Sequence, residues 1–222
     1  MTDLMDDLVN LQSRRRRRLS VAGLVVILVV ALALGWAGWQ FLGSGVWARA
    51  QHADQIRELR TQWESGEPAP PGERAPASEA YAILRVPEFG AEFEVPVRNG
   101  TEPRDLRRGV GAYASSVRPG QIGNLAIAGY RTTHGAPFGK LLELDKGDEV
   151  EIETREAVYT YVLDVPARDV TVGPDDAWVL DPVPGTADEP TQPTLTLTTS
   201  QDLVHSPDRS VAFGHLGATR TK

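Results

Sequence analysis

Hydrophobic and polar positions follow two different patterns along this chain of 222 residues. From Val21 to Leu42 almost every side chain is apolar and none is charged. At about 1.5 Å per residue, a helix over this range would be about 33 Å long, enough to cross the hydrocarbon core of a bilayer. The pattern therefore predicts a transmembrane helix over residues 19–43, preceded by a tail over residues 1–18.

Charged and aromatic residues beside the apolar run predict its orientation. Five arginines, Arg14 to Arg18, directly precede it, and basic residues next to a span favour the cytoplasmic side. Trp36, Trp39 and Trp47 lie at the other end, where indole rings favour the membrane interface. We expect a single-pass protein of the cell membrane, with a cytoplasmic N-terminus and an extracellular C-terminal domain. The alternative is a cleaved signal peptide, whose apolar run is shorter, about 7–15 residues.

Residues 44–78 are expected to connect this span to a folded domain. Trp47 to Ser65 is polar and predicts a helix that continues out of the membrane. Glu67 to Ser78 is rich in proline and alanine, a composition typical of an extended spacer. We therefore expect a juxtamembrane segment followed by a stalk.

From residue 79 to residue 222 short strand-like runs alternate with turn residues. Glu149–Thr154 and Ala157–Val165 predict a hairpin, and Thr194–Thr199 and Ser210–Leu216 predict the last strands. Several short strands with few helices predict a mainly all-β domain, a barrel or a sandwich. Short helices are expected at two further places. One is Leu106–Tyr113, where Gly109 and Gly111 suggest the helix end. The other is Ala136–Leu144, with Phe138, Leu141, Leu142 and Leu144 inward.

Composition excludes several classes of function. The net charge is −7, and beyond Arg18 the chain carries 18 basic and 27 acidic residues, which argues against binding to nucleic acid. There is no cysteine, so disulfides, thiolate metal sites and a cysteine nucleophile are excluded. One group of carboxylates lacks the tight spacing of a calcium loop: Asp145, Asp148, Glu149, Glu151 and Glu153. We expect neither a metal ion nor a cofactor.

Two segments carry the candidate chemistry. Thr194–Ser200, with the sequence TLTLTTS, predicts a strand that ends at a nucleophile position, and Arg209 follows nine residues later. Gly129–Gly135, with the sequence GYRTTHG, lies upstream. In this order the segments resemble the active-site frame of the sortases, most of all class E, where they normally contain TLTTC and GHRTTYG. The resemblance covers about Tyr81 to Leu216 and implies the closed eight-stranded β-barrel of that family.

The resemblance also implies the roles of the site residues. Sortases are cysteine transpeptidases that cleave the Thr–Gly peptide of a sorting signal, with a histidine as acid and base and an arginine that stabilises the oxyanion or positions the substrate. The equivalent positions here are Ser200, Tyr130 and Arg209. His134 stands where class E relatives have a tyrosine associated with signal selection, so Thr133, His134 and Arg209 are the candidate substrate-binding residues. The implied partner is a sorting-signal-like peptide or a cell-wall or envelope protein.

The two replacements act in the same unfavourable direction. A serine hydroxyl needs an adjacent base to become a nucleophile, whereas a tyrosine phenol, with an ordinary pKa of about 10, donates a hydrogen bond near pH 7. We therefore expect an impaired pseudo-sortase that binds a peptide or pairs with an active sortase. One alternative is an active transpeptidase or hydrolase that uses Ser200 with His134 or His205 and Arg209. The other is a structural envelope module whose cleft is vestigial. For Arg209 by itself, the alternative is an ordinary surface charge.

Overall fold

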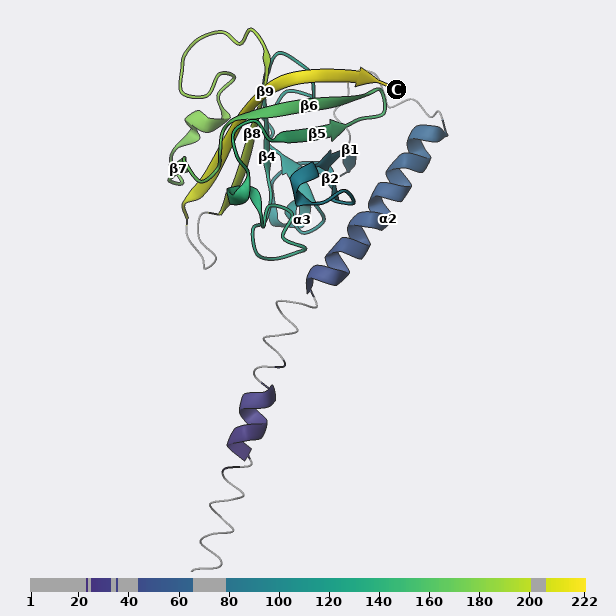
Figure 1. The fold of residues 1–222 in the computed structure, drawn as a ribbon, viewed down its shortest axis with the longest axis vertical. Helices are drawn as coiled ribbons and strands as arrows, with labels where there is room; N and C mark the ends of the chain where they lie inside the picture. The colour runs from purple at the N-terminus through teal and green to yellow at the C-terminus, as the bar shows by residue number, and fades with distance from the viewer. Residues whose placement is uncertain (1–22, 24, 33–34, 36–43, 66–78, 201–206) are drawn as a thin grey trace, which may run out of the picture. The chain divides into compact units, whose positions relative to one another are not determined.

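The computed structural model describes residues 23, 25–32, 35, 44–65, 79–200 and 207–222 (Figure 1). The chain divides into two units, Met1–Ser44 and Gly45–Lys222. In the first unit residues 25–32 are helical, and their large apolar side chains are exposed. Among the described residues, no helix is both long enough and apolar enough to span a bilayer. The predicted span, tail and stalk lie wholly or largely outside the described residues.

The second unit contains a closed β-barrel. Eight of its nine strands follow the order β6-β5-β1-β2-β3-β4-β8-β9, and pairing between β6 and β9 closes the circle. The short strand β7 pairs with the beginning of β9 outside this circle. The predicted eight-stranded barrel is therefore confirmed. The strands are β1 (Ala80–Arg85), β2 (Glu94–Asn99), β3 (Val110–Ala112), β4 (Gly123–Ala128), β5 (Glu149–Glu153), β6 (Ala157–Val165), β7 (Thr171–Val172), β8 (Pro193–Ser200) and β9 (Arg209–Thr221).

The centre of the barrel is built around two adjacent parallel strands, β4 and β8. Leu125 is in register with Leu195, and Ile127 with Leu197. All four side chains are fully buried, because alternate residues of a strand point to the same face and here that face is the core. The apolar alternation of the TLTLTTS segment thus fixes which way its threonines and Ser200 are directed.

The helix predicted at Leu106–Tyr113 is wrong. The helix α3 covers Pro103–Leu106, and the following residues form β3, which pairs in parallel with β2. Gly111 lies so close to the carbonyl oxygen of Gly100 that a Cβ atom there would clash with it. The glycines that suggested a helix end therefore serve the close packing of strands.

Elsewhere in the barrel, helical structure is limited to short 3-10 turns within residues 79–200 and 207–222. The expected turn at Ala136–Leu144 is confined to η3 (Leu141–Glu143). Its apolar residues are placed largely as predicted, since Phe138, Leu141 and Leu144 are buried and Leu142 is partly buried. The other two turns are η2 (Pro87–Phe89) and η4 (Ala177–Leu180).

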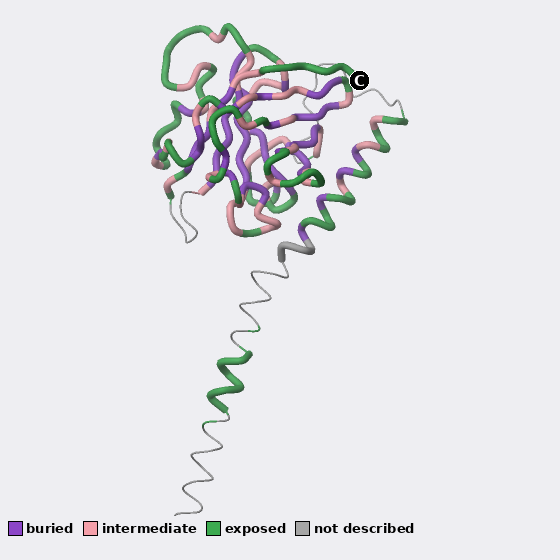
Figure 2. Tube along the Cα trace, in the orientation of Figure 1, coloured by how far each residue is buried: buried purple, intermediate pink, exposed green. Residues whose placement is uncertain are grey.

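The polar helix predicted near Trp47 exists as α2 (Ser44–Glu64), and it packs against the barrel. Ala48, His52, Ile56 and Leu59 are buried on this helix, and their spacing of three and four residues places them on one face. The buried positions alternate with exposed ones along α2 in Figure 2. Ile56 and Leu59 form an apolar cluster with Ile83 of β1.

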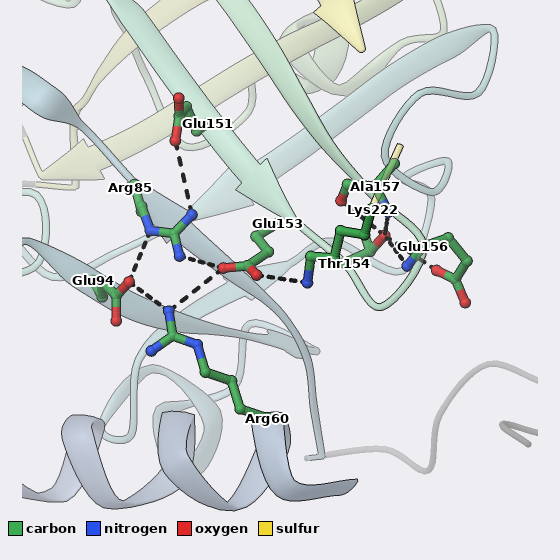
Figure 3. A network of polar contacts seen from close by, with 9 residues as sticks. All are labelled: Arg60, Arg85, Glu94, Glu151, Glu153, Thr154, Glu156, Ala157 and Lys222. Atoms are coloured by element: carbon green, nitrogen blue, oxygen red, sulfur yellow. Dashed lines mark hydrogen bonds and ion pairs between the residues drawn. The ribbon is translucent and has the colours of Figure 1, made fainter. Parts of the chain in front are cut away.

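A network of charged side chains joins α2 to the strands β1, β2 and β5 and to Lys222, the residue after β9 (Figure 3). Glu94 accepts hydrogen bonds from Arg60 Nη2 at 2.6 Å and from Arg85 Nε at 2.8 Å. Glu153 pairs with Arg85 and, at 2.6 Å, with Lys222 Nζ. Burial acts to raise the pKa of Glu153, but the hydrogen bond from Lys222 and the charge of Arg85 outweigh it, so that the pKa is lowered. Both carboxylates therefore remain ionised as parts of the fold.

Candidate active site

Ser200 and Arg209 lie directly opposite each other. Ser200 is the last residue of β8, Arg209 is the first of β9, and the antiparallel register pairs the two. Ser200 is partly buried and Arg209 is exposed. Since cross-strand partners point to the same face of a sheet, the guanidinium is placed to contact a group bound at the serine.

Tyr130 reaches the same end of the barrel through β4. Ala128 is in register with Thr198, and the backbone N–H of Gly129 donates to the carbonyl oxygen of Thr198 at 3.1 Å. The Thr199 hydroxyl in turn donates to the carbonyl oxygen of Gly129 at 2.9 Å. These bonds continue the β4–β8 pairing by one residue and bring Tyr130 to the end of β8, where Ser200 lies.

His134 stacks on Tyr130. The two ring centroids are 4.9 Å apart, and the ring planes are inclined by 28°. His134 Nδ1 is 2.9 Å from the hydroxyl oxygen of Thr133. Burial, and to a smaller extent the charge of Arg107, holds the pKa of His134 below its ordinary value. The imidazole is therefore mainly neutral near pH 7 and is able to accept a proton.

The backbone around His134 is unusual. His134 has a φ of 53° and Ala136 a φ of 48°, and Gly135 between them also has a positive φ of 86°. Residues other than glycine rarely adopt this left-handed backbone conformation, and those that do often lie at functional sites. The conformation supports the prediction that this loop has a role beyond connecting β4 to η3.

Arg131 is a site residue that the sequence interpretation missed. Its Nη1 atom donates to the carbonyl oxygen of Ser200 at 3.5 Å. A second cation therefore lies beside the end of β8, in addition to Arg209. Its position directly after Tyr130 in the GYRTTHG segment is the only signal in the sequence, and it points to Ser200 only once the pairing of β4 with β8 is known.

The threonines of β8 hold the strand in place, as a strand interpretation of the TLTLTTS segment predicts. Thr196 donates to Asn124 Oδ1 at 2.8 Å, and the hydroxyl groups of Thr198 and Tyr113 are 3.1 Å apart. Three threonines of the segment are buried, and their hydroxyl groups are hydrogen-bonded: Thr196, Thr198 and Thr199. Buried hydroxyls need such partners, so the rigid end of β8 is built into the motif.

No imidazole is hydrogen-bonded to the serine in the part of the chain that the structure describes. Within residues 79–200 and 207–222, no hydrogen bond connects the Ser200 hydroxyl with a histidine nitrogen. His205, the other candidate base, lies outside the described residues. The described site therefore offers a hydroxyl, two guanidinium groups and a neutral imidazole stacked on a phenol.

Four of the five acidic residues considered for calcium have other partners. Asp145 pairs with Arg168, and Asp148 accepts a hydrogen bond from the backbone of Asp145. Glu151 and Glu153 lie beside Arg85. Among the residues that the structure describes, no group of three or more His, Asp or Glu side chains could hold a metal ion.

Comparison with protein families shows where this arrangement belongs. The sortase domain family matches residues 84–217. Sortase SrtE1 of Streptomyces coelicolor is 31% identical over 169 residues, which make up 73% of this chain and 44% of that relative. The chain spans between 39% and 57% of the lengths of the curated relatives it matches.

Solved structures agree in fold and in the type of relative. Sortase E from Streptomyces avermitilis has a TM-score of 0.60 and 34% identity, covering 66% of this chain and 93% of that one. Sortase E1 from Streptomyces coelicolor with a tripeptide in the active site has a TM-score of 0.56 and 28% identity, covering 66% and 94%. The family match and the barrel topology coincide over the same residues. The chain belongs to the sortase family and is similar to its class E members.

Proposed function

We propose that this protein is a catalytically impaired, class E-like sortase that binds a sorting-signal-like peptide or an envelope protein at the Ser200 site, formed by Tyr130, His134, Ser200 and Arg209. The single observation that supports this best is the pairing of Ser200 with Arg209 at the end of β8, in a chain without cysteine. The arginine is in the place where a bound carbonyl or carboxylate would need it, whereas the thiol and the histidine of the family are replaced.

The chemical deficit follows from the residue types. In the family's reaction the nucleophile attacks the threonine carbonyl carbon, and a base removes its proton. A positioned general base contributes typically 10²–10⁴-fold to such a step, and an alcohol depends on it more than a thiol does. With Tyr130 at the base position, the protein keeps peptide binding by Arg209 but loses turnover.

An active serine enzyme is the second candidate. It is favoured by one observation, the neutral imidazole of His134 stacked on Tyr130. In that mechanism Ser200 Oγ forms a bond to the threonine carbonyl carbon while its proton passes to His134. The proton then goes to the departing glycine amine as the C–N bond breaks, and an amine or water releases the ester. His205 is the other base for this mechanism.

The two candidates are separated by measuring turnover and binding on the same protein. The full-length chain is incubated with LPxTG-type and LAxTG-type peptides and an amine acceptor, and binding is measured by calorimetry. We expect binding without turnover. Arg209→Ala should weaken binding roughly 10-fold, the loss of one charge-assisted hydrogen bond, and Ser200→Ala should leave it unchanged.

Arg220→Ala is the matched control, since Arg220 is an exposed residue near the other end of β9. It removes the same charge away from Ser200 and should not alter binding. Turnover that disappears in Ser200→Ala would contradict the proposal and establish the serine enzyme. Absence of both binding and turnover would favour a structural envelope module, with or without an active sortase as its partner.

We also propose that the protein is anchored as a single-pass membrane protein with an extracellular barrel. The proposal is supported by the apolar run and its arginine flank, and by the helical, exposed apolar residues 25–32. Because the chain has no cysteine, single cysteines report topology directly. In intact cells an impermeant maleimide should label Thr219→Cys but not Ser13→Cys. Release of the protein into the medium, or labelling of both variants, would contradict the anchor.

A further inference from the structure

The loop that carries His134, here called the His134 loop (residues 130–138), is in close contact with α2. A Cβ atom placed on Gly135 would lie 3.1 Å from the Cβ atom of Ala48 and 3.3 Å from Cε1 of His52. These distances leave room for the bare backbone of a glycine and for little more. The contact joins α2 to the residue directly after His134.

The His134 loop itself is held at its two ends but is strained at its tip. The backbone N–H of Phe138 donates to the carbonyl oxygen of Tyr130 at 3.0 Å, and that of Ala136 donates to Thr133 at 2.9 Å. Phe138 is fully buried. Between these anchors His134 and Ala136 are both left-handed, a conformation that persists only where the surroundings enforce it. The surroundings at the tip are Tyr130 and α2.

The helix is well placed to enforce it, because α2 is fixed to the barrel along its length. Ile56 packs against Ile83, Arg60 pairs with Glu94 at 2.6 Å, and Gln55 accepts a hydrogen bond from Arg98 Nη1 at 2.6 Å. At the end nearest the loop, His52 is only 4% exposed.

The side chain of His52 contributes to the contact with the loop through its shape more than through hydrogen bonds. Its Nε2 atom has no hydrogen-bond partner among the described residues, and burial lowers the pKa of His52 to about 4. The ring is therefore neutral near pH 7. An unpaired polar atom in a buried seam costs stability, so the position is explained better by what the ring touches, the backbone at Gly135.

We propose that Ala48 and His52 are positioning residues, which hold the His134 loop in its left-handed conformation and so determine which side chains of a bound peptide the Ser200 site accepts. The statement about peptide selection rests on the proposed function. The statement about the loop does not, because it concerns the conformation of the free protein.

Hydrogen–deuterium exchange on the full-length chain tests the loop directly. The amides of Ala136 and Phe138 report whether the loop remains closed. In Ala48→Leu the longer side chain meets Gly135, and we expect these amides to exchange at least 10-fold faster. Ala53→Leu is the matched control, since Ala53 is on the exposed face of the same helix, and it should exchange like the wild type.

A second pair of variants covers the case in which Ala48→Leu does not fold. His52→Ala leaves a void beside Gly135 and should also accelerate exchange, whereas His52→Leu keeps the volume and should restore protection. Equal exchange in Ala48→Leu and Ala53→Leu, or in His52→Ala and His52→Leu, would overturn the inference whether or not any peptide binds.

Peptide selection is then measured as the ratio of the dissociation constants for LPxTG-type and LAxTG-type peptides. We expect this ratio to change at least 3-fold in His52→Ala and to return in His52→Leu. An altered loop with an unchanged ratio would overturn the selection half of the inference. If the wild type binds no peptide, the proposed function fails, and exchange alone decides the role of α2.

Discussion

The ring of His134 lies stacked on the ring of Tyr130, with 4.9 Å between their centroids. In the correspondence that we propose, Tyr130 stands at the position of the family's histidine, so the imidazole of His134 would stand next to that position instead of in it. At the same end of the barrel, Ser200 faces Arg209, and we propose that it stands at the position of the family's cysteine. The proposal is thus a sortase frame whose two reactive groups are exchanged for weaker ones.

Restoring both groups should restore activity. The double variant Ser200→Cys with Tyr130→His should cleave a sorting-signal peptide at least 100-fold faster than the wild type, because it regains both a thiolate and a base. The rate of product release, measured by liquid chromatography, checks this. Each single variant should remain well below the double variant.

A third substitution shows whether the restored reaction uses this site. Adding Arg209→Ala to the double variant should reduce the rate again by about 10-fold or more, whereas adding Arg220→Ala should not. A double variant that stays inactive while binding peptide would mean that more than these two positions has diverged.

The hydroxyl pair of Tyr113 and Thr198 should contribute measurably to stability. Their oxygen atoms are 3.1 Å apart, and Thr198 is only 1% exposed. Tyr113→Phe leaves the Thr198 hydroxyl without this partner and should lower the free energy of unfolding by about 1–2 kcal/mol. Urea titration measures this change in the free energy of unfolding. In the double variant with Thr198→Val the loss should be smaller than the sum of the two single losses.

The barrel was predicted from the resemblance to the sortases, since the strand-like runs alone left a barrel or a sandwich open. The meeting of Ser200 with Arg209 was predicted because TLTLTTS indicates a strand that ends at Ser200, and a second strand follows after a short loop. The role of Arg131 beside Ser200 depends on how β4 and β8 pair, which local pattern does not reveal.

Helices were predicted less well, for two different physical reasons. Gly109 and Gly111 suggested the end of a helix, whereas tight packing between β2 and β3 requires them. The docking of α2 was not expected, because its buried stripe is narrow and includes His52 and Ala48 among many charged residues. A stripe of this kind shows its partner only when the barrel surface is present.

Glu153 should make the domain sensitive to acid. Its pKa is lowered from the ordinary value of 4.5 by Lys222 and Arg85, against the opposing effect of burial. Because the folded pKa is lower than the unfolded one, this stabilisation is fully present above about pH 4.5 and is lost as the pH falls below it. Glu153→Gln should cost roughly 2 kcal/mol at pH 7, since Lys222 loses its carboxylate partner and Arg85 keeps only Glu94 and Glu151.

The control for this prediction is Glu149→Gln, an exposed residue on the same strand, β5. Unfolding by urea at pH 7 and at pH 4 should show a smaller loss on acidification for Glu153→Gln than for the control. Equal losses in the two variants would mean that the network in Figure 3 adds little to the acid response.

Docking of α2 against the barrel should weaken on acidification at a higher pH than the pH at which Glu153 becomes protonated. Burial lowers the pKa of His52 from 6.5 to about 4, so the undocked helix binds a proton more tightly. The free energy of docking is therefore fully present above about pH 6.5 and decreases as the pH falls towards 4. The total decrease is on the order of 3 kcal/mol. Arg98 of β2, the other basic side chain buried in this seam, keeps its charge throughout this pH range.

Fluorescence of Trp63, which packs against the cluster of Ile56 and Leu59, follows this transition. The wild type should shift its emission to longer wavelength between pH 6.5 and pH 4.5, and His52→Leu should not. Trp63→Phe identifies the part of the signal that comes from this ring. An identical shift in wild type and His52→Leu would show that another group controls docking.

We propose that Ser200 lacks an effective base and so forms no acyl intermediate with a peptide that it binds. Intact-mass spectrometry of the full-length protein, quenched in acid after incubation with a sorting-signal peptide, tests it most directly. We expect the unmodified mass for the wild type, and a mass increased by one acyl group for the Ser200→Cys and Tyr130→His double variant. An acyl group on the wild type that is absent in Ser200→Ala would contradict it.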